Sequence, residues 1–171
     1  GKKLPKTNVR FMKIKKVLLW IISIIIIIQI VIGVGFYIFQ YKLLFRSSPL
    51  PQDYKFSFSQ SFEEVFIPSG NDTINGLLFT RPEKTGLIIY FHGNADNLSQ
   101  WGQLANDFTN RGFDLLMVDY PTFGKSTGKL SQKSLIDMGR NVYEYATRLY
   151  PENKIALYGR SMGTGIASKV A

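Results

Sequence analysis

The sequence contains no cysteine and one histidine, His92. The first absence excludes disulfides and cysteine metal sites. Because the sequence has one histidine, His92 is the single candidate for any mechanism that needs an imidazole. Residues 1–46 also lack acidic side chains, although they carry nine basic ones. The remaining residues carry twelve side chains of each sign, so the net charge of +9 belongs entirely to the N-terminal segment.

An uncharged apolar run at residues 17–39 lies within this basic segment. As a helix it reaches roughly 34 Å, slightly more than a hydrocarbon core of about 30 Å. Basic tails can bind nucleic acid, but charges that flank such a run favour a membrane surface instead. A cleaved signal peptide has a shorter apolar region, about 7–15 residues, that ends at small residues. The isoleucine block also disfavours a buried core helix. We therefore expect a single-pass anchor that contacts the lipid bilayer, and no nucleic-acid partner.

The sequence divides into four expected regions. They are a basic cytoplasmic tail at 1–16, the transmembrane anchor at 17–39, a polar juxtamembrane stalk at 40–61 and a globular domain at 62–171. Seven basic residues precede the apolar run and two follow it closely. This bias predicts a cytoplasmic N-terminus and a globular region on the other side of the membrane.

Strand and helix patterns alternate within the globular region. Continuous apolar runs are typical of strands buried on both faces, whereas apolar side chains three and four residues apart indicate a helix. The expected strands are 64–68, 73–80, 86–91, 113–120 and 154–159, and helices are expected near 98–112, from Ser131 and after Ser161. This order predicts an α/β fold with a mostly parallel sheet and helices on both faces.

The segment Gly159-Arg160-Ser161-Met162-Gly163 fits the pattern G-x-S-x-G between an apolar strand and a small-residue helix. Such a turn strains the backbone at the serine, so we expect a positive φ at Ser161. Glycines on either side allow the strand and helix to approach closely. The hydroxyl would then stand at a helix N-terminus, where partial positive charge favours anionic intermediates. The pattern is also compatible with a glycine-rich turn whose serine has no chemical role.

Two other polar stretches follow expected strands. His92 has no carboxylate or histidine at ligand spacing, so we expect a structural hydrogen-bonding residue and not a metal ligand. The sequence Gly-Lys-Ser at 124–126 resembles a phosphate-binding loop, but Asp119 stands where that loop needs a glycine. Asp119 ends a strand where ligands gather and could be a catalytic acid, but its expected role is to hold the loop that follows it. We therefore expect no metal and no organic cofactor.

Three motifs occur in order: FHGNADN at 91–97, VDYPTFGKSTG at 118–128 and YGRSMGTG at 158–165. Together they resemble the membrane-anchored, lipase-like serine hydrolases of the α/β-hydrolase superfamily, over roughly residues 62–171. The resemblance implies hydrolysis of an ester, thioester or amide bond through an acyl-serine intermediate. It implies Ser161 as the nucleophile, and an oxyanion hole made by the backbone N–H groups of Asn94 and Met162. The expected structural neighbours of this site are His92, Gly93, Asp119, Gly159 and Gly163.

In this superfamily the catalytic acid and histidine follow the nucleophile, but no histidine follows Ser161 in this sequence. We therefore expect the chain to be the N-terminal part of such an enzyme, truncated after the nucleophile turn and inactive by itself. The alternative is a natural short form, a non-catalytic membrane-tethered binding protein on a decayed hydrolase scaffold. The substrate would be a small-molecule, lipid or peptide acyl compound, and the sequence does not identify it further.

The charge bias predicts a testable topology. A membrane-impermeant amine label or a protease applied from the cytoplasmic side should modify residues 2–16 and leave the region after Ser47 protected. A protected N-terminus together with cleavage of the globular region would reverse the predicted orientation.

Overall fold

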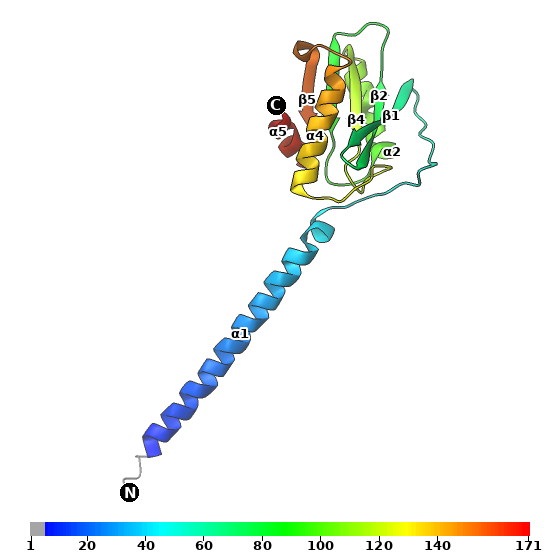
Figure 1. The fold of residues 1–171 in the computed structure, drawn as a ribbon. Coiled ribbons are helices and arrows are strands. Elements are labelled where there is room, and N and C mark those ends of the chain that lie inside the picture. The colour runs from blue at the N-terminus through cyan, green and yellow to red at the C-terminus, as the bar shows by residue number, and fades with distance from the viewer. Residues whose placement is uncertain (1–5) are drawn as a thin grey trace. The chain divides into compact units, whose positions relative to one another are not determined.

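The computed structural model describes residues 6–171, with side chains described for residues 11–40 and 45–171. The chain separates into two compact units, one ending at Leu44 and the other comprising Phe45–Ala171. Figure 1 shows its elements, which are α1 (Lys6–Leu44), β1 (Phe62–Ser69), β2 (Asp72–Phe79), β3 (Gly86–Phe91), α2 (Leu98–Trp101), η1 (Gly102–Leu104), α3 (Ala105–Thr109), β4 (Phe113–Val118), α4 (Gln132–Thr147), η2 (Glu152–Lys154), β5 (Ile155–Gly159) and α5 (Met162–Val170).

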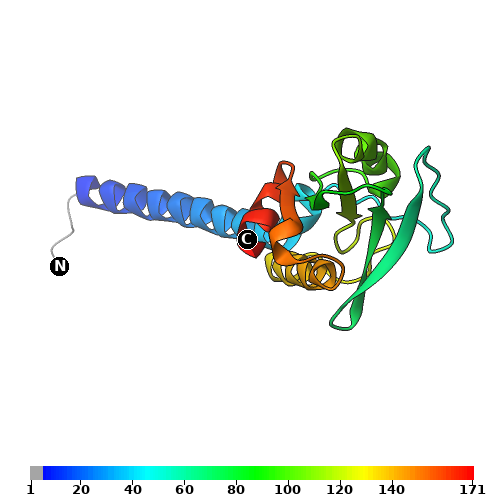
Figure 2. The ribbon, with the colours of Figure 1, turned by 90° about the horizontal axis from the view of Figure 1, so that it is seen from above.

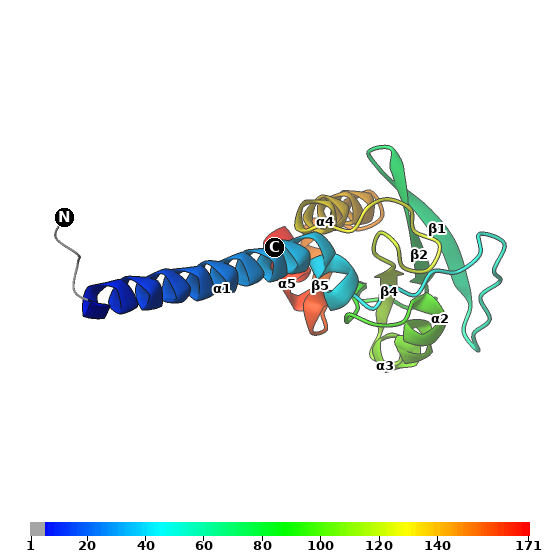
Figure 3. The same ribbon diagram turned by 90° about the horizontal axis from the view of Figure 1, so that it is seen from below.

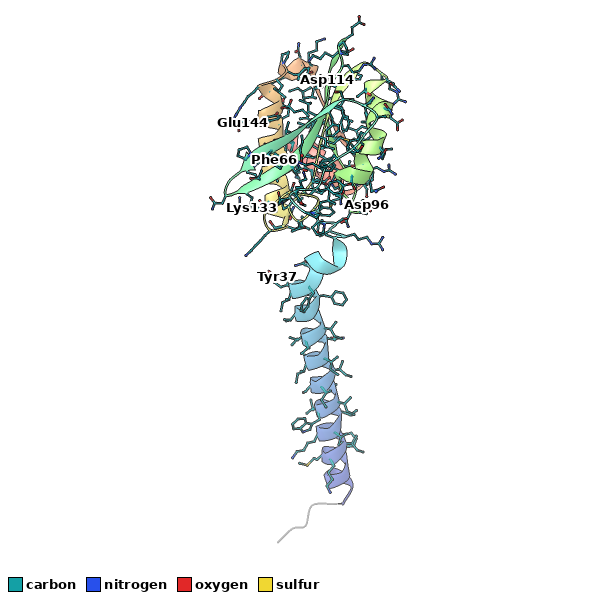
Figure 4. All side chains as sticks on the ribbon, turned by 90° about the vertical axis from the view of Figure 1, so that its right-hand side faces the viewer. Tyr37, Phe66, Asp96, Asp114, Lys133 and Glu144 are labelled. Carbon is teal, nitrogen blue, oxygen red and sulfur yellow. The ribbon has the colours of Figure 1, made fainter. Side chains whose placement is uncertain are left out.

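The first unit is the single long helix α1, which contains the whole expected anchor at 17–39. Its apolar side chains project on all sides, with Tyr37 near one end (Figure 4), and those from Val17 to Phe39 are about half exposed or more. Within the described residues, Phe11–Gln40 is the one helical stretch long and apolar enough to cross a membrane. A helix that is apolar all round has no polar face to present to water, which makes it a candidate membrane span.

The second unit is built on a five-stranded sheet with the order β1-β2-β4-β3-β5. The strands β4, β3 and β5 are parallel neighbours, whereas β2 is antiparallel to both β4 and β1. Only β2 therefore runs against the other four strands of this sheet. The mostly parallel sheet expected from the sequence is confirmed in this sense.

Helices cover both faces of the sheet (Figures 2 and 3). One apolar cluster packs the sheet against α4 and α5, and a second packs the other face against α2 and α3. Successive residues of β4 divide between the two, since Leu116 and Val118 belong to the first cluster while Leu115 and Met117 belong to the second. This alternation follows from the two-residue period of a strand. It explains why the central strands are apolar at consecutive positions.

Two local expectations were wrong. The stretch expected as one helix near 98–112 is broken into α2, η1 and α3, although Asn97 does cap its start by accepting a hydrogen bond from the Ser99 N–H. The strand β5 is not buried on both faces, since Tyr158 is 46% exposed. In this sheet β5 pairs with β3 alone, so its outer edge and one face are open to solvent.

The buried ammonium group of Lys125 links the loop after β4 to the first strand, β1. The Lys125 side chain is 3% exposed, and its Nζ lies 2.7 Å from Oε1 of Glu64 in β1. The same Nζ lies 5.0 Å from the ring centre of Phe56, in the extended segment before β1. Burial strengthens this pair relative to a surface pair because water screens it less.

We predict that Lys125→Met lowers the free energy of unfolding by about 2 kcal/mol, because it leaves the Glu64 carboxylate without its cation. This is below the roughly 3–5 kcal/mol of a fully buried pair, since the Glu64 side chain is 25% exposed. The matched control is Lys133→Met, which removes an exposed pair with Asp137 and should cost at most about 1 kcal/mol. Chemical denaturation in mild detergent would measure both, and equal losses would contradict this role of Lys125.

Candidate active site

The turn between β5 and α5 holds Ser161 in a strained conformation. Its φ is 51° and its ψ is −117°, which lie outside the backbone regions that residues other than glycine normally adopt. The positive φ expected from the sequence is therefore present. Ser161 is exposed and directly precedes the first residue of α5, and its side chain does not cap that helix. Strain of this kind is found at functional sites that the surrounding structure holds in place.

Two glycines permit the tight packing that holds this turn. A Cβ added at Gly163 would lie 2.0 Å from the carbonyl oxygen of Phe91, the last residue of β3. A Cβ added at Gly159 would lie 2.5 Å from the carbonyl carbon of Gly163. The Arg160 N–H also donates to the Phe91 oxygen, at 2.9 Å. The start of α5 therefore rests directly on the end of β3, and any side chain at these glycines would push them apart.

His92 follows β3 and is fully buried, so it is not available to solvent or to a substrate. Its Nδ1 lies 2.7 Å from the Gly93 carbonyl oxygen and its Nε2 lies 3.1 Å from Oδ1 of Asp119. Because the carbonyl can only accept, Nδ1 carries a proton. The contact at Nε2 then needs a second proton, on His92 or on Asp119. Both nitrogens of the single imidazole are thus engaged within the fold.

Asp119 connects the two loops that follow β3 and β4. Its carboxylate accepts from the backbone N–H of Leu98, at 3.2 Å from each oxygen, as well as contacting His92. Burial raises the pKa of the Asp119 carboxyl, and the hydrogen bond with His92 opposes that shift. A Cβ at Gly124, where φ is 49°, would overlap Oδ2 of Asp119. The carboxylate therefore sits at the centre of a closely packed loop junction.

The structure brings the expected site residues into one region, at the ends of β3, β4 and β5. A Cβ at Gly93 would lie 3.8 Å from the Arg160 carbonyl oxygen, so the loop after β3 borders the turn that holds Ser161. Asn94 follows in that loop, and its Oδ1 accepts a hydrogen bond from the Arg46 N–H at 3.2 Å. The Met162 N–H belongs to the first residue of α5. Within the described residues, no group of three or more potential metal ligands gathers at this site or elsewhere.

Two sets of contacts at this site were not predicted from the sequence motifs: the contact of Trp101 with Arg160, and the contacts of the residues just before Leu50. The guanidinium of Arg160 lies 5.1 Å from the ring centre of Trp101, in α2. The residues just before Leu50, expected in a stalk, bind the loops after β3 and β4. Neither contact has a local sequence signature, because each joins residues far apart in the chain.

Solved structures with similar folds place this architecture among the α/β-hydrolases. An α/β-hydrolase from Vibrio vulnificus matches with a TM-score of 0.59 and 22% identity, covering 64% of this chain and 39% of that one. A Pyrococcus furiosus esterase, Pf2001, matches with a TM-score of 0.54 and 22% identity, covering 71% and 49%. The expected fold class is confirmed by this likeness.

The chain belongs to the serine aminopeptidase S33 family of hydrolases, whose family model matches residues 82–171. Human protein ABHD12B is 36% identical over 87 residues, which cover 50% of this chain and 24% of that protein. Escherichia coli YfhR is 35% identical over 101 residues, covering 57% and 33%. A probable lysophospholipase L2 of Haemophilus influenzae is 33% identical over 89 residues, covering 48% and 28%. The matched part thus spans a quarter to a third of the length of these relatives.

The close approach at Gly163 can be tested by adding a single methyl group. We predict that Gly163→Ala lowers the free energy of unfolding by at least about 2 kcal/mol, because the new Cβ would overlap the Phe91 carbonyl. The control is Gly165→Ala in the same helix, where a Cβ would meet nothing within 4 Å. That change should be neutral or stabilising by up to about 1 kcal/mol, since alanine favours a helix. Chemical denaturation that gave the same result for both variants would contradict the packing described here.

Proposed function

We propose that the chain carries the nucleophile and oxyanion hole of a membrane-anchored serine hydrolase. The observation that carries this proposal is the strained turn at Ser161, exposed at the N-terminus of α5 and held there by Gly159 and Gly163. Membership of a hydrolase family supports the reaction class. Ser161 is the proposed nucleophile, and the backbone N–H groups of Met162 and Asn94 are the proposed oxyanion donors.

In the proposed reaction the Ser161 oxygen attacks the carbonyl carbon of an ester, thioester or amide, and its proton passes to a base. The carbonyl oxygen becomes an oxyanion, which the two N–H groups and the helix dipole would stabilise. When this intermediate collapses, the base returns the proton to the leaving group. An alcohol, thiol or amine departs, and the acyl group stays on Ser161. Water then cleaves the acyl-serine by the same route and releases the acid.

The base of this reaction is a histidine other than His92 in our proposal. His92 is fully buried, and its two nitrogens contact Gly93 and Asp119. Recruiting it would require breaking the Asp119 contact and exposing a buried ring. The sequence has no second histidine, so the base would come from residues beyond this sequence, and the 171 residues alone would not turn over substrate. A non-catalytic binding role remains the second candidate, favoured by this same engagement of His92.

The proposed substrate class is an acyl ester, with thioesters and amides as chemically related alternatives. Two similar proteins carry related descriptions, a Pyrococcus furiosus esterase and a probable lysophospholipase. The candidate span Phe11–Gln40 supports attachment to a membrane. We propose a single-pass protein with a cytoplasmic N-terminus, from the excess of basic residues before the apolar run.

We predict that an alkyl fluorophosphonate labels Ser161 in preference to Ser168, an exposed serine in α5. Serine hydrolases that lack a triad member still accelerate the reaction roughly 10³–10⁴-fold over water, through the oxyanion hole and substrate binding. Slow labelling of Ser161 should therefore persist without a base. Peptide mass spectrometry after long incubation would locate the phosphonyl group. Equal labelling of both serines would contradict an activated hydroxyl, and unchanged labelling of the peptide 158–171 in Ser161→Ala would exclude Ser161 as the reacting residue.

A further inference from the structure

Residues 46–50, named the strap below, lie across both loops of the proposed site. They belong to the unit Phe45–Ala171 and precede β1 by more than ten residues. Pro49 forms a parallel bridge with Gly124, and the Leu50 N–H donates to the Gly124 oxygen at 2.8 Å. The strap thus adds a short strand-like pairing to the loop after β4. The sequence predicts a polar juxtamembrane stalk over these residues.

The first contact of the strap reaches the loop after β3. The Arg46 N–H donates to the side-chain Oδ1 of Asn94, at 3.2 Å. The Asn97 side chain in turn donates to Ser48, at 3.0 Å from its carbonyl oxygen and 3.1 Å from its hydroxyl. Asn97 also caps α2. Two points of this loop, one of them the proposed oxyanion residue, are therefore bound by the strap.

The second set of contacts reaches the loop after β4. The Ser47 hydroxyl donates to the Thr122 carbonyl oxygen, and the Gly124 N–H donates to the Ser48 carbonyl oxygen at 2.9 Å. Ser48 therefore bridges the two loops directly, because its carbonyl accepts from Asn97 of one loop and Gly124 of the other.

Both loops contain backbone conformations that need such external support. Asp96 has a φ of 58° in the first loop and Thr122 a φ of 74° in the second. Left-handed conformations at residues with a Cβ cost of order 1–3 kcal/mol and persist where neighbours hold them. Thr122 is β-branched, which makes this conformation more costly. The Ser47 hydroxyl binds the carbonyl of this same residue.

We propose that the strap is a positioning element of the active site. Arg46 and Ser48 hold the loop 92–97, and Ser47 and Ser48 hold the neighbouring loop after β4, so that the Asn94 N–H faces the position where an oxyanion forms on Ser161. This inference rests on the proposed function, because it gives Asn94 the role of an oxyanion donor. It makes the segment that directly follows α1 a part of the catalytic domain and not a passive linker.

The first test asks whether the strap orders the loops. The full chain in detergent micelles is compared with Ser47→Ala/Ser48→Ala, which removes both strap hydroxyls. The matched control is Ser57→Ala/Ser59→Ala, two exposed serines of the same extended segment. We expect backbone amide exchange to become about tenfold faster at 92–98 and 120–126 in the strap variant, with no change in α4, since loss of a hydrogen bond or two is worth about that factor. The control should exchange like the wild type.

The second test asks whether this order reaches the oxyanion site. Phenylboronic acid is the probe: the Ser161 oxygen adds to boron, its proton leaves to the buffer, and boron becomes tetrahedral and anionic, as boron NMR would show. We expect the strap variant to bind it about tenfold more weakly, and Ser47→Thr/Ser48→Thr, which keeps the hydroxyls, to restore binding. Arg46→Pro removes the N–H that binds Asn94 and should weaken binding similarly, whereas Arg46→Ala keeps it and should not.

The outcomes separate this inference from the proposed function. Unchanged loop exchange in both the strap variant and Arg46→Pro would overturn the strap's role. Faster exchange with unchanged, Ser161-dependent boronate binding would show an ordering segment without effect on the oxyanion site, and would also overturn it. If Ser161→Ala binds boronate like the wild type, the nucleophile assignment is wrong, and the exchange measurement still decides whether the strap orders the loop.

Discussion

The close approach of α5 to the end of β3 is the constraint on which the site depends. Gly163 lies where any Cβ would overlap the Phe91 carbonyl, so the helix begins directly on the strand. The chain can make this junction only by turning sharply between β5 and α5, and Ser161 takes the strained position at the turn. The same contact sets the loop after β3 beside the serine, because that loop starts at His92, whose carbonyl oxygen would lie 2.8 Å from a Gly163 Cβ. One packing contact therefore fixes both Ser161, the proposed nucleophile, and the loop proposed to stabilise its oxyanion.

Asp119 holds together the loops that follow β3 and β4. It is fully buried, and its carboxylate joins His92, the start of α2 and the close approach of Gly124. A buried carboxyl at such a junction is costly unless its oxygens are satisfied, and here backbone and imidazole groups satisfy them. As a result, the single imidazole of the chain, on His92, makes structural contacts with both of its nitrogens. The proposed hydrolase therefore needs a different histidine, whereas the proposed oxyanion donors are already within this unit.

The sequence predicted the features that depend on local pattern. The apolar runs at 86–91 and 113–120 contain β3 and β4, and Ser131, where a helix was expected to begin, is the N-cap of α4. Burial of β5 was predicted wrongly, because an apolar run does not reveal whether a strand has neighbours on both sides. The binding of residues 46–50 to loops some 50 to 75 positions away was not predicted at all. Such contacts are made by backbone groups and small hydroxyls, which leave no periodicity and no motif. The roles of Ser161, Asn94 and Met162 remain proposals.

A crystal structure of the chain with Ser161 phosphonylated by a fluorophosphonate would test the central claim most directly. The phosphonyl oxygen then stands in for the oxyanion of the tetrahedral intermediate. We predict a positive φ at Ser161 and a phosphonyl oxygen within about 2.7–3.1 Å of the backbone nitrogens of both Met162 and Asn94. An adduct whose oxygen points to solvent, or a Ser161 incorporated into a regular helical turn away from the loop after β3, would contradict it.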